Sequence, residues 1–164
     1  MTEIVKAAEE RQFKLIENLA DKIWREHYTA IIGIDQVNFM LKKFQSFEAI
    51  QEQIHQGYLY FILKFERKET GYISIKKDKD ALFLSKIYVL KSLRGHGIGK
   101  KAMEFIEQKA LELNCSYIQL TVNKNNVDSI KAYEKMGFVK QEDIVIDIGN
   151  GFVMDDYRMT KSIS

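Results

Sequence analysis

The thirteen residues VLKSLRGHGIGKK, at positions 89–101, decide how the rest of the sequence is interpreted. They lead from a β-rich segment into a segment with helical periodicity, and they contain Gly95, Gly97 and Gly99. Glycines let a ligand approach the backbone closely, and the free N–H groups at a helix N-terminus favour an anion. This stretch therefore predicts a phosphate-binding loop, with a plain glycine-rich turn as the alternative.

The glycine spacing separates this loop from two well-known phosphate sites. The dinucleotide fingerprint needs G-x-G-x-x-G, whereas the glycines here are spaced G-x-G-x-G. A P-loop would need glycine where Arg94 stands and serine or threonine where Lys101 stands. The pattern that does match is R-x-x-G-x-G, formed by Arg94, Gly97 and Gly99.

A second stretch, VNKNNVDSIKAYEKMGF at 122–138, follows the loop at a distance of one helix and one strand. Apolar residues at helical spacing predict a helix over 98–113, and period-two alternation predicts a strand over 117–122. A helix between two strands predicts a parallel crossover. A short helix over 126–136 is expected to end at Gly137, which suits the position after a helix C-cap.

The other elements follow from the same patterns. We predict a strand at 4–7, helices at 10–28 and from Asp35, and a further helical segment capped by Ser46. An antiparallel meander is expected over 58–90, with turns at 69–71 and 78–80. Two strands at 139–148 and 152–160 flank a Gly149-Asn150-Gly151 hairpin turn. The predicted order is β-α-α-β-β-β-α-β-α-β-β, a mixed α/β (α+β) domain on one central sheet.

Composition narrows the class of protein. A length of 164 residues predicts one domain covering 1–164, and the net charge of +2 gives no reason to expect nucleic acid or an anionic membrane as partner. The longest apolar run has six residues, and the N-terminus has no apolar signal region. Cys115 is the only cysteine and the three histidines are scattered. These features predict a cytoplasmic protein without a metal site.

The two glycine-containing stretches together resemble the signatures of the GNAT superfamily of N-acetyltransferases, in the family order. The segment at 81–89 also resembles the fourth strand of that family. The resemblance implies a single GNAT-like domain that uses acetyl-CoA as cosubstrate.

Residue by residue, the resemblance implies a cofactor site and one catalytic group. Tyr133 would be the general acid for the leaving thiolate, and a tyrosine packed on the sheet is the alternative. Asn126 would bind the pantetheine or thioester region, although a helix N-cap would also explain it. The remaining residues expected to bind the cofactor are Ile87, Tyr88 and Val89 along the pantetheine arm and Arg94, Gly95, His96, Gly97, Ile98, Gly99 and Lys100 at the pyrophosphate. For His96, a solvent-facing loop histidine is the alternative.

One departure from the family pattern concerns the general base. Many members carry a glutamate on the fourth strand, at the position that matches Ser85 here. The sequence therefore predicts no carboxylate base from this strand. A water chain through Ser85, Asn123 or backbone carbonyls is the hypothesis that replaces it.

The acceptor site is expected to involve Trp24, Tyr28 and Asn123. The segments IWREHY at 23–28 and GFVMDDY at 151–157 resemble bacterial polyamine acetyltransferases of the PaiA type. Carboxylates near aromatic rings would suit a cationic amine. The alternatives are that Trp24 is a core residue, that Asp155 is solvated, and that Asp156 caps a helix or pairs with a lysine.

The function hypothesis is transfer of an acetyl group from acetyl-CoA to a primary amine, a small amine or a polyamine, by direct attack on the thioester. The alternatives are acetylation of a protein N-terminus or lysine, and a non-catalytic module that binds acyl-CoA. The expected partners are a small-molecule amine and a second copy in a homodimer, with neither nucleic acid nor membrane.

Overall fold

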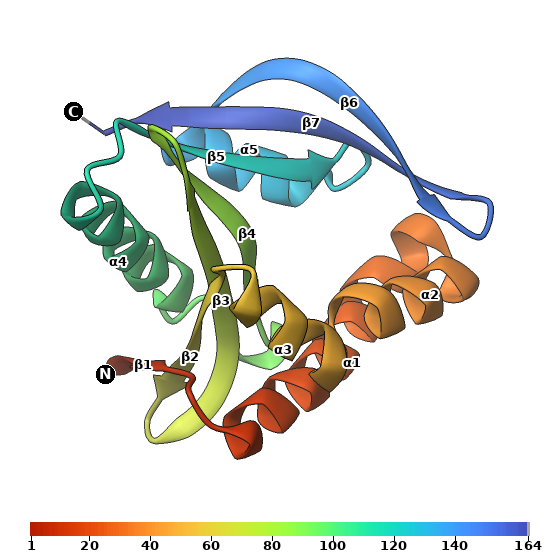
Figure 1. The fold of residues 1–164 in the computed structure, drawn as a ribbon, viewed down its shortest axis with the longest axis horizontal. Helices are drawn as coiled ribbons and strands as arrows, with labels where there is room; N and C mark the ends of the chain where they lie inside the picture. Colours follow the sequence, from red (N-terminus) through yellow and green to blue (C-terminus); the bar gives the residue numbers. More distant parts are fainter. Residues whose placement is uncertain (164) are drawn as a thin grey trace. The chain divides into compact units, whose positions relative to one another are not determined.

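The structure is a computed structural model that describes residues 1–163. Over those residues it contains a seven-stranded mixed sheet and five α-helices (Figure 1). The strand order is β1-β2-β3-β4-β5-β7-β6, which confirms the predicted α/β class. The elements are β1 (Thr2–Lys6), α1 (Glu10–Ile32), α2 (Ile34–Phe44), α3 (Phe47–His55), β2 (Leu59–Phe65), β3 (Lys68–Asp78), β4 (Ala81–Val89), a 3₁₀ turn (Lys91–Leu93), α4 (Ile98–Glu112), β5 (Tyr117–Asn123), α5 (Val127–Lys135), β6 (Val139–Gly149) and β7 (Phe152–Ser162).

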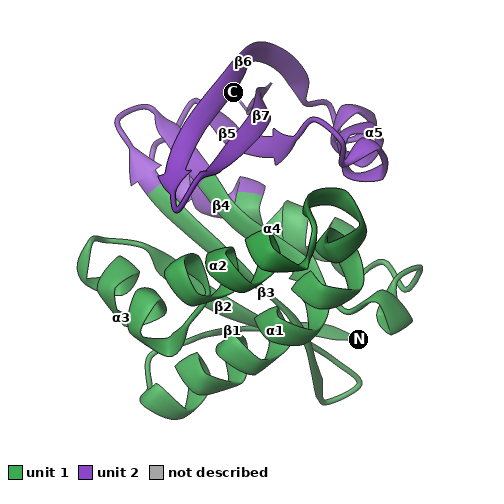
Figure 2. Ribbon diagram, turned by 90° about the vertical axis from the view of Figure 1, so that its right-hand side faces the viewer, with its two compact units in different colours: residues 1–76, 84–106 green, residues 77–83, 107–164 purple. Residues whose placement is uncertain are grey.

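The chain divides into two compact units (Figure 2). Unit 1 comprises residues 1–76 and 84–106, which include β1, β2, α1–α3, most of β3 and β4, and the first part of α4. Unit 2 comprises residues 77–83 and 107–164, which include the end of α4, β5, α5, β6 and β7.

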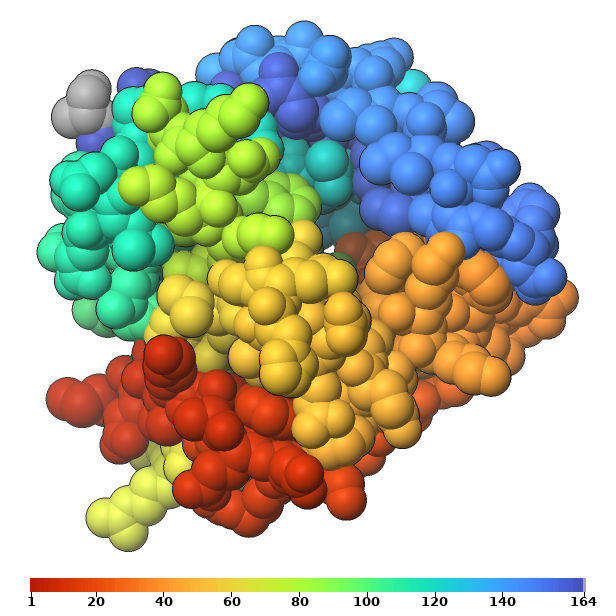
Figure 3. Space-filling model, viewed as in Figure 1, coloured from red at the N-terminus to blue at the C-terminus, as the bar shows by residue number. Residues whose placement is uncertain are grey.

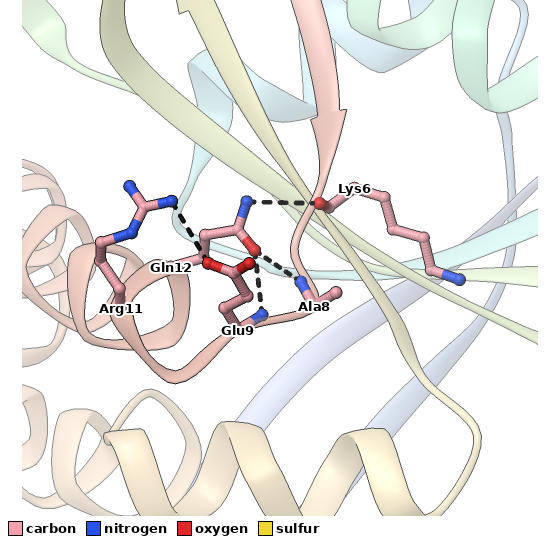
Figure 4. A network of polar contacts seen from close by, with 5 residues as sticks. All are labelled: Lys6, Ala8, Glu9, Arg11 and Gln12. Atoms are coloured by element: carbon pink, nitrogen blue, oxygen red, sulfur yellow. Dashed lines mark hydrogen bonds and ion pairs between the residues drawn. The ribbon is translucent and has the colours of Figure 1, made fainter.

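A capping box begins the first helix (Figure 4). The Oε1 atom of Gln12 accepts from the amides of Ala8, at 2.7 Å, and Glu9, at 3.0 Å. Its Nε2 atom donates to the carbonyl of Lys6 at 3.5 Å. One side chain thus satisfies backbone groups on the connection from β1 and fixes how α1 leaves the sheet.

Unit 1 has helices on both faces of its strands. Adjacent residues of β2 face opposite sides, as strand geometry requires. Tyr60 lies on the side of α3, where its hydroxyl meets the side chain of Gln53. Phe61 lies on the other side, with its ring 4.9 Å from the ring of Phe105 in α4. Both tyrosine and phenylalanine are buried, so this strand is part of the core.

Three helices precede β2, which agrees with the three predicted helical segments, although the predicted element order counted only two of them. The chain leaves helical geometry at Gln45, and Ser46 then caps α3 by accepting from the amide of Ala49 at 3.2 Å. The Oε2 atom of Glu17 accepts from the amide of Phe47 at 2.7 Å. These two acceptors make α3 a separate helix, and the predicted capping role of Ser46 is confirmed.

The predicted turn at 69–71 is wrong. The β2–β3 turn lies at Glu66 and Arg67, whose φ angles are 52° and 69°, and it projects from the surface (Figure 3). Gly71 lies within β3, opposite Leu63. Its role is to let two strands approach, because a Cβ atom there would lie 2.0 Å from the carbonyl oxygen of Tyr88 in β4.

Replacing Gly71 by alanine is expected to lower the free energy of unfolding by about 2–3 kcal/mol, since the methyl group meets backbone that cannot move aside cheaply. Urea denaturation measures this loss. Lys68→Ala on the exposed start of the same strand is the control, and we expect it to change stability little. A Gly71→Ala protein as stable as wild type would contradict the close approach of β3 and β4.

Unit 2 combines one parallel pair with an antiparallel ribbon. Ala81–Phe83 pair in parallel with Tyr117–Gln119, as the predicted crossover requires. β7 pairs antiparallel with β5 on one side and with β6 on the other. Asn150 and Gly151 both have positive φ angles, 55° and 78°, so they form the two-residue turn of the predicted hairpin.

Among residues 1–163, no helix is long and apolar enough to cross a membrane.

Candidate functional site

The loop between β4 and α4 lies in unit 1 and adopts the conformation that its glycines permit. Gly95 and Gly97 have φ angles of 89° and 77°, in the left-handed region that other residues rarely adopt. Ile98 is 2% exposed and anchors the start of α4 in the core. Residues 94–97 are exposed. The loop is therefore fixed at its helical end and open to solvent along its length.

The amides of this loop form a run of hydrogen-bond donors. Within residues 1–163, the six consecutive N–H groups from Gly95 to Lys100 donate to no acceptor. The next amide, that of Lys101, donates to the carbonyl of Gly97 at 3.1 Å and begins the helical pattern. The partial positive charge of the helix N-terminus adds to these donors. Such a concave run of amides can bind a phosphate or diphosphate group.

Cations flank the loop. Arg94 and Lys100 are exposed, and within the described chain neither forms an ion pair. The ring of His96 lies 5.1 Å from the ring of Phe65, and the residue is exposed. The alternative of a solvent-facing loop histidine therefore agrees with its exposure, although one side of its ring is against an aromatic neighbour.

An aromatic group in unit 1 contains two of the predicted acceptor residues. The ring centroid of Trp24 lies 4.4 Å from that of Tyr28 and 5.7 Å from that of Tyr88 in β4. The buried Tyr72 also belongs to this group, because its ring centroid lies 5.4 Å from that of Tyr88. Trp24 is buried, as a core residue would be, while Tyr28 and Tyr88 are half-buried. Tyr88, which is expected to bind the cofactor, therefore packs against Trp24, which is expected to bind the acceptor.

The strand that carries Tyr88 also carries a buried lysine that the sequence analysis did not single out. The Nζ atom of Lys86 donates to the carbonyl of Phe44 at 2.7 Å, to Oε1 of Gln53 at 2.9 Å, and to the hydroxyl of Tyr60. The residue is 5% exposed, and burial lowers the pKa of Lys86 to about 7. Lys86 therefore joins β4 to the end of α2 and to α3.

In unit 2, Tyr133 is positioned by the way its helix ends. The amide of Phe138 donates to the carbonyl of Tyr133, and that of Gly137 to the carbonyl of Glu134, both at 3.0 Å. These bonds and the φ of 100° at Gly137 form a Schellman motif. The rings of Tyr133 and Phe138 lie 5.7 Å apart, edge to face. The sequence Tyr133 to Phe138 is therefore a helix stop that also fixes the tyrosine ring.

Two asparagines lie where β5 ends and α5 begins. Asn126 occupies the N-cap position through its carbonyl, which accepts from Ile130 at 3.1 Å, but its side chain forms no capping bond and is 3% exposed. The Oδ1 atom of Asn123 accepts from the amide of Asn125 at 2.8 Å. Asn126 therefore caps α5 through its backbone carbonyl, and its side chain takes no part in that cap.

The last hairpin separates two neighbouring carboxylates. Asp155 pairs with Lys124 at 2.9 Å, and Asp143 pairs with the same lysine at 3.2 Å. Asp156 is 4% exposed and has no ion pair within residues 1–163. Burial, then the charge of Asp155, raise the pKa of Asp156 to about 6. The alternative that Asp156 pairs with a lysine is therefore wrong, and Asp155 is ion-paired rather than simply solvated.

The predicted residues fall into two sets. Unit 1 holds Ile87, Tyr88, Val89, the loop residues 94–100, and the acceptor candidates Trp24 and Tyr28. Unit 2 holds Asn123, Asn126 and Tyr133. Ser85 is half-buried in β4. The sequence indicates no role for Lys86, and it places Asp156 only in a segment of carboxylates near aromatic rings. Strand alternation could have indicated that Asp155 and Asp156 lie on different faces. Within the described residues, no three His, Cys, Asp or Glu side chains form a group that could hold a metal ion.

Comparisons with known proteins agree with this fold. The model of the Acetyltransferase (GNAT) family matches residues 16–138. An uncharacterized N-acetyltransferase in the pepI 3′ region of Lactobacillus delbrueckii subsp. lactis is 26% identical over 134 residues, which cover 77% of this chain and 74% of that protein. A probable spermine N(1)-acetyltransferase of Bacillus subtilis subsp. natto is 33% identical over 58 residues, 35% of this chain and 38% of its own length.

Among solved structures, the PaiA N-acetyltransferase of Thermoplasma acidophilum in complex with coenzyme A has a TM-score of 0.82 at 18% identity, and the match covers 99% of both chains. The TM-score shows that the two chains share a fold. The family match spans the glycine loop, β5 and all of α5, which are the segments described above. The chain belongs to the GNAT family of acetyltransferases.

Proposed function

We propose that this protein transfers the acetyl group of acetyl-CoA to a primary amine, and that the acceptor is a small amine or a polyamine. The observation that carries the proposal is the run of six amides from Gly95 to Lys100, none of which donates to an acceptor within residues 1–163. A diphosphate satisfies many donors at once and is attracted by the helix N-terminus. Coenzyme A carries such a group, and the fold neighbour from Thermoplasma was crystallised with it.

The strand before the loop would bind the pantetheine arm. Backbone groups of Ile87 and Val89 are suited to pair with the amides of an extended arm, in the manner of an added strand. The N–H of Val89 is the proposed donor to the thioester oxygen as negative charge develops there. Asn126, with its buried side chain, would bind the pantetheine or thioester region.

The chemistry requires two proton transfers. An alkylamine with a pKa of about 10.4 is charged at pH 7, and removing its proton there costs about 4–5 kcal/mol. The neutral nitrogen then attacks the thioester carbonyl, and the carbon–sulfur bond breaks to release the thiolate. Tyr133 is the proposed donor of a proton to that thiolate, because a phenol has a pKa near 10.

The acceptor class is supported by unit 1 and by the relatives. The half-buried rings of Tyr28 and Tyr88, which pack against the buried ring of Trp24, form an aromatic surface that would attract an ammonium group through cation–π interaction. A relative is named a probable spermine N(1)-acetyltransferase. The homodimer, the cytoplasmic location and the absence of nucleic-acid and membrane partners stay predictions from the sequence.

Release of free thiol from acetyl-CoA, measured with a panel of acceptors, tests the proposal. The panel contains spermine, spermidine, a monoamine, a peptide with a free N-terminus and a peptide with an internal lysine. We expect turnover with a polyamine or the monoamine. Turnover with the peptides alone would replace the proposal by protein acetylation. Tight CoA binding without any turnover would replace it by an acyl-CoA-binding module.

Replacing Gly99 by alanine separates the loop's binding role from its folding role. Gly99 lies in the first turn of α4 without a positive φ, and a Cβ atom there would meet nothing within 4 Å. Alanine should raise the free energy of unfolding by up to about 1 kcal/mol, because it favours helix. It should also weaken CoA binding at least about tenfold, since the methyl group stands beside the donor amides.

Isothermal titration with CoA and urea denaturation measure the two effects of Gly99→Ala. A folded variant that binds CoA as tightly as wild type would contradict the phosphate site at this loop.

A further inference from the structure

Asp156 lies on one face of the β5–β7–β6 ribbon, and the neighbouring cations Lys124 and Arg158 are paired with other carboxylates. In the register it is directly opposite Asn123 of β5 and Ile144 of β6. Side chains of directly paired residues share a face, and neighbours along a strand alternate. Asn123, which the sequence assigns to the acceptor, is therefore the cross-strand neighbour of Asp156.

The alternation also shows where the cations of this ribbon lie relative to the Asp156 carboxylate. Lys124 is bound by Asp155 and Asp143, which lie on the face opposite to Asp156. Arg158 shares the face of Asp156, but its guanidinium group is already bonded. Its Nε atom donates to Oε1 of Glu142 at 2.7 Å, and its Nη1 atom donates to Oε1 of Gln119 at 3.4 Å. Lys124, which directly follows β5, and Arg158 of β7 are thus already paired with other carboxylates. The Thr121 hydroxyl is the hydrogen-bonding neighbour of Asp156.

A carboxylate that is 96% buried without a counter-ion is costly to keep charged. Burial raises the pKa of Asp156 to about 6, which leaves it mainly ionised at pH 7 to 8 and basic enough to accept a proton. Groups of this kind are concentrated at functional sites. Within residues 1–163 Asp156 forms no ion pair, and the proposed substrate, an alkylammonium ion, carries a charge opposite to that of the carboxylate.

We propose that the Asp156 carboxylate receives the ammonium group of the acceptor and takes one of its protons before attack on the thioester. This inference rests on the proposed function. The ammonium ion and the carboxylate become a neutral amine and a carboxylic acid. The amine nitrogen forms the new bond to the acetyl carbon, the carbon–sulfur bond breaks, and the nitrogen's surplus proton is transferred to the thiolate through Tyr133. Asp156 then loses its proton to solvent, so one turnover yields amide, thiol and one proton.

The test compares Asp156→Asn with wild type, using spermidine and hydroxylamine as acceptors. Spermidine is charged at neutral pH and needs a base, whereas hydroxylamine is neutral there and needs none. At pH 7.5 we expect Asp156→Asn to lower kcat/KM for spermidine about 100-fold or more. The loss for hydroxylamine should be less than about threefold. A purely structural role would lower both rates together.

The pH profile provides the second readout. For wild type, kcat/KM for spermidine should fall below about pH 6, as Asp156 becomes protonated. In Asp156→Asn that acidic limb should be absent, and the remaining rate should rise with pH toward the pKa of the amine. Asp143→Asn is the matched control, because it removes an exposed carboxylate of the same ribbon and should keep the wild-type profile.

The outcomes are distinguishable. Spermidine turnover by Asp156→Asn within threefold of wild type, or a wild-type profile without the limb near pH 6, would overturn the inference and leave the acetyltransferase proposal standing. If Asp156→Asn does not fold, the wild-type profile decides alone. If wild type binds CoA but acetylates neither spermidine nor hydroxylamine, the proposed function fails and the inference fails with it.

Discussion

Replacing Tyr133 by phenylalanine is expected to lower kcat by about 10²- to 10⁴-fold, the usual contribution of a positioned general acid. The thiolate would then leave without a proton donor at the enzyme. CoA affinity and stability should change little, for a structural reason. Phenylalanine keeps the ring that packs edge to face on Phe138, and the Schellman bonds use the carbonyl of residue 133 rather than its side chain.

Three measurements check the Tyr133→Phe prediction: kcat with the best acceptor of the panel, CoA binding by titration, and the unfolding transition. Tyr117→Phe is the matched control, because Tyr117 is a half-buried tyrosine at the start of β5 in the same unit. We expect that control to retain wild-type kcat. A Tyr133→Phe enzyme with unchanged kcat would remove this residue from the mechanism.

The stability of the protein should rise between pH 7 and pH 10 because of Lys86. Burial lowers its pKa to about 7 in the folded protein, against 10.5 for an ordinary lysine. Between these values the unfolded chain carries a proton that the folded chain lacks. The free energy of unfolding therefore increases with pH by up to about 1.4 kcal/mol per unit. The stabilisation is lost as the pH falls toward 7, and over the whole interval we expect about 2–4 kcal/mol.

Urea denaturation at several pH values measures this effect, and Lys86→Met should remove most of the slope. The exposed Lys68→Met is the control and should keep it. The comparison of slopes is more informative than absolute stability, since Lys86→Met also leaves the carbonyl of Phe44 and the side chain of Gln53 without their donor. A wild-type profile that is flat between pH 7 and 10 would contradict a buried lysine of low pKa.

Local signals in the sequence were enough to predict most of the fold. The helix predicted over 98–113, the stop at Gly137 and the hairpin turn predicted within 149–151 depend on residues close together in the chain. All three are confirmed, with the helix ending at Glu112 and the turn formed by Asn150 and Gly151. The cap at Ser46 is equally local. The glycine loop could be assigned because its spacing is specific and because the second motif follows in order.

The errors and omissions concern contacts that are distant in sequence. Gly71 was assigned to a turn, whereas it lies inside β3, since its meaning depends on the Tyr88 carbonyl of another strand. Lys86 looks like an ordinary strand residue until Phe44, Gln53 and Tyr60 are folded around it. No local pattern reports such an environment. Asp155 and Asp156 are adjacent and chemically identical in sequence, and only their strand register separates an ion pair from a buried carboxylate.

Because of that register, the hairpin turn determines which aspartate lies on which face of the ribbon several residues away. A slip of one residue along β7 would bring Asp155 to the face of Asn123 and move Asp156 to the face of Lys124. The amino-acid composition would be unchanged, yet the charge on each face of the ribbon would be exchanged. Insertions in the turn at Asn150 and Gly151 that shift this register would therefore change which carboxylate lies beside Asn123, even though the turn itself lies several residues away.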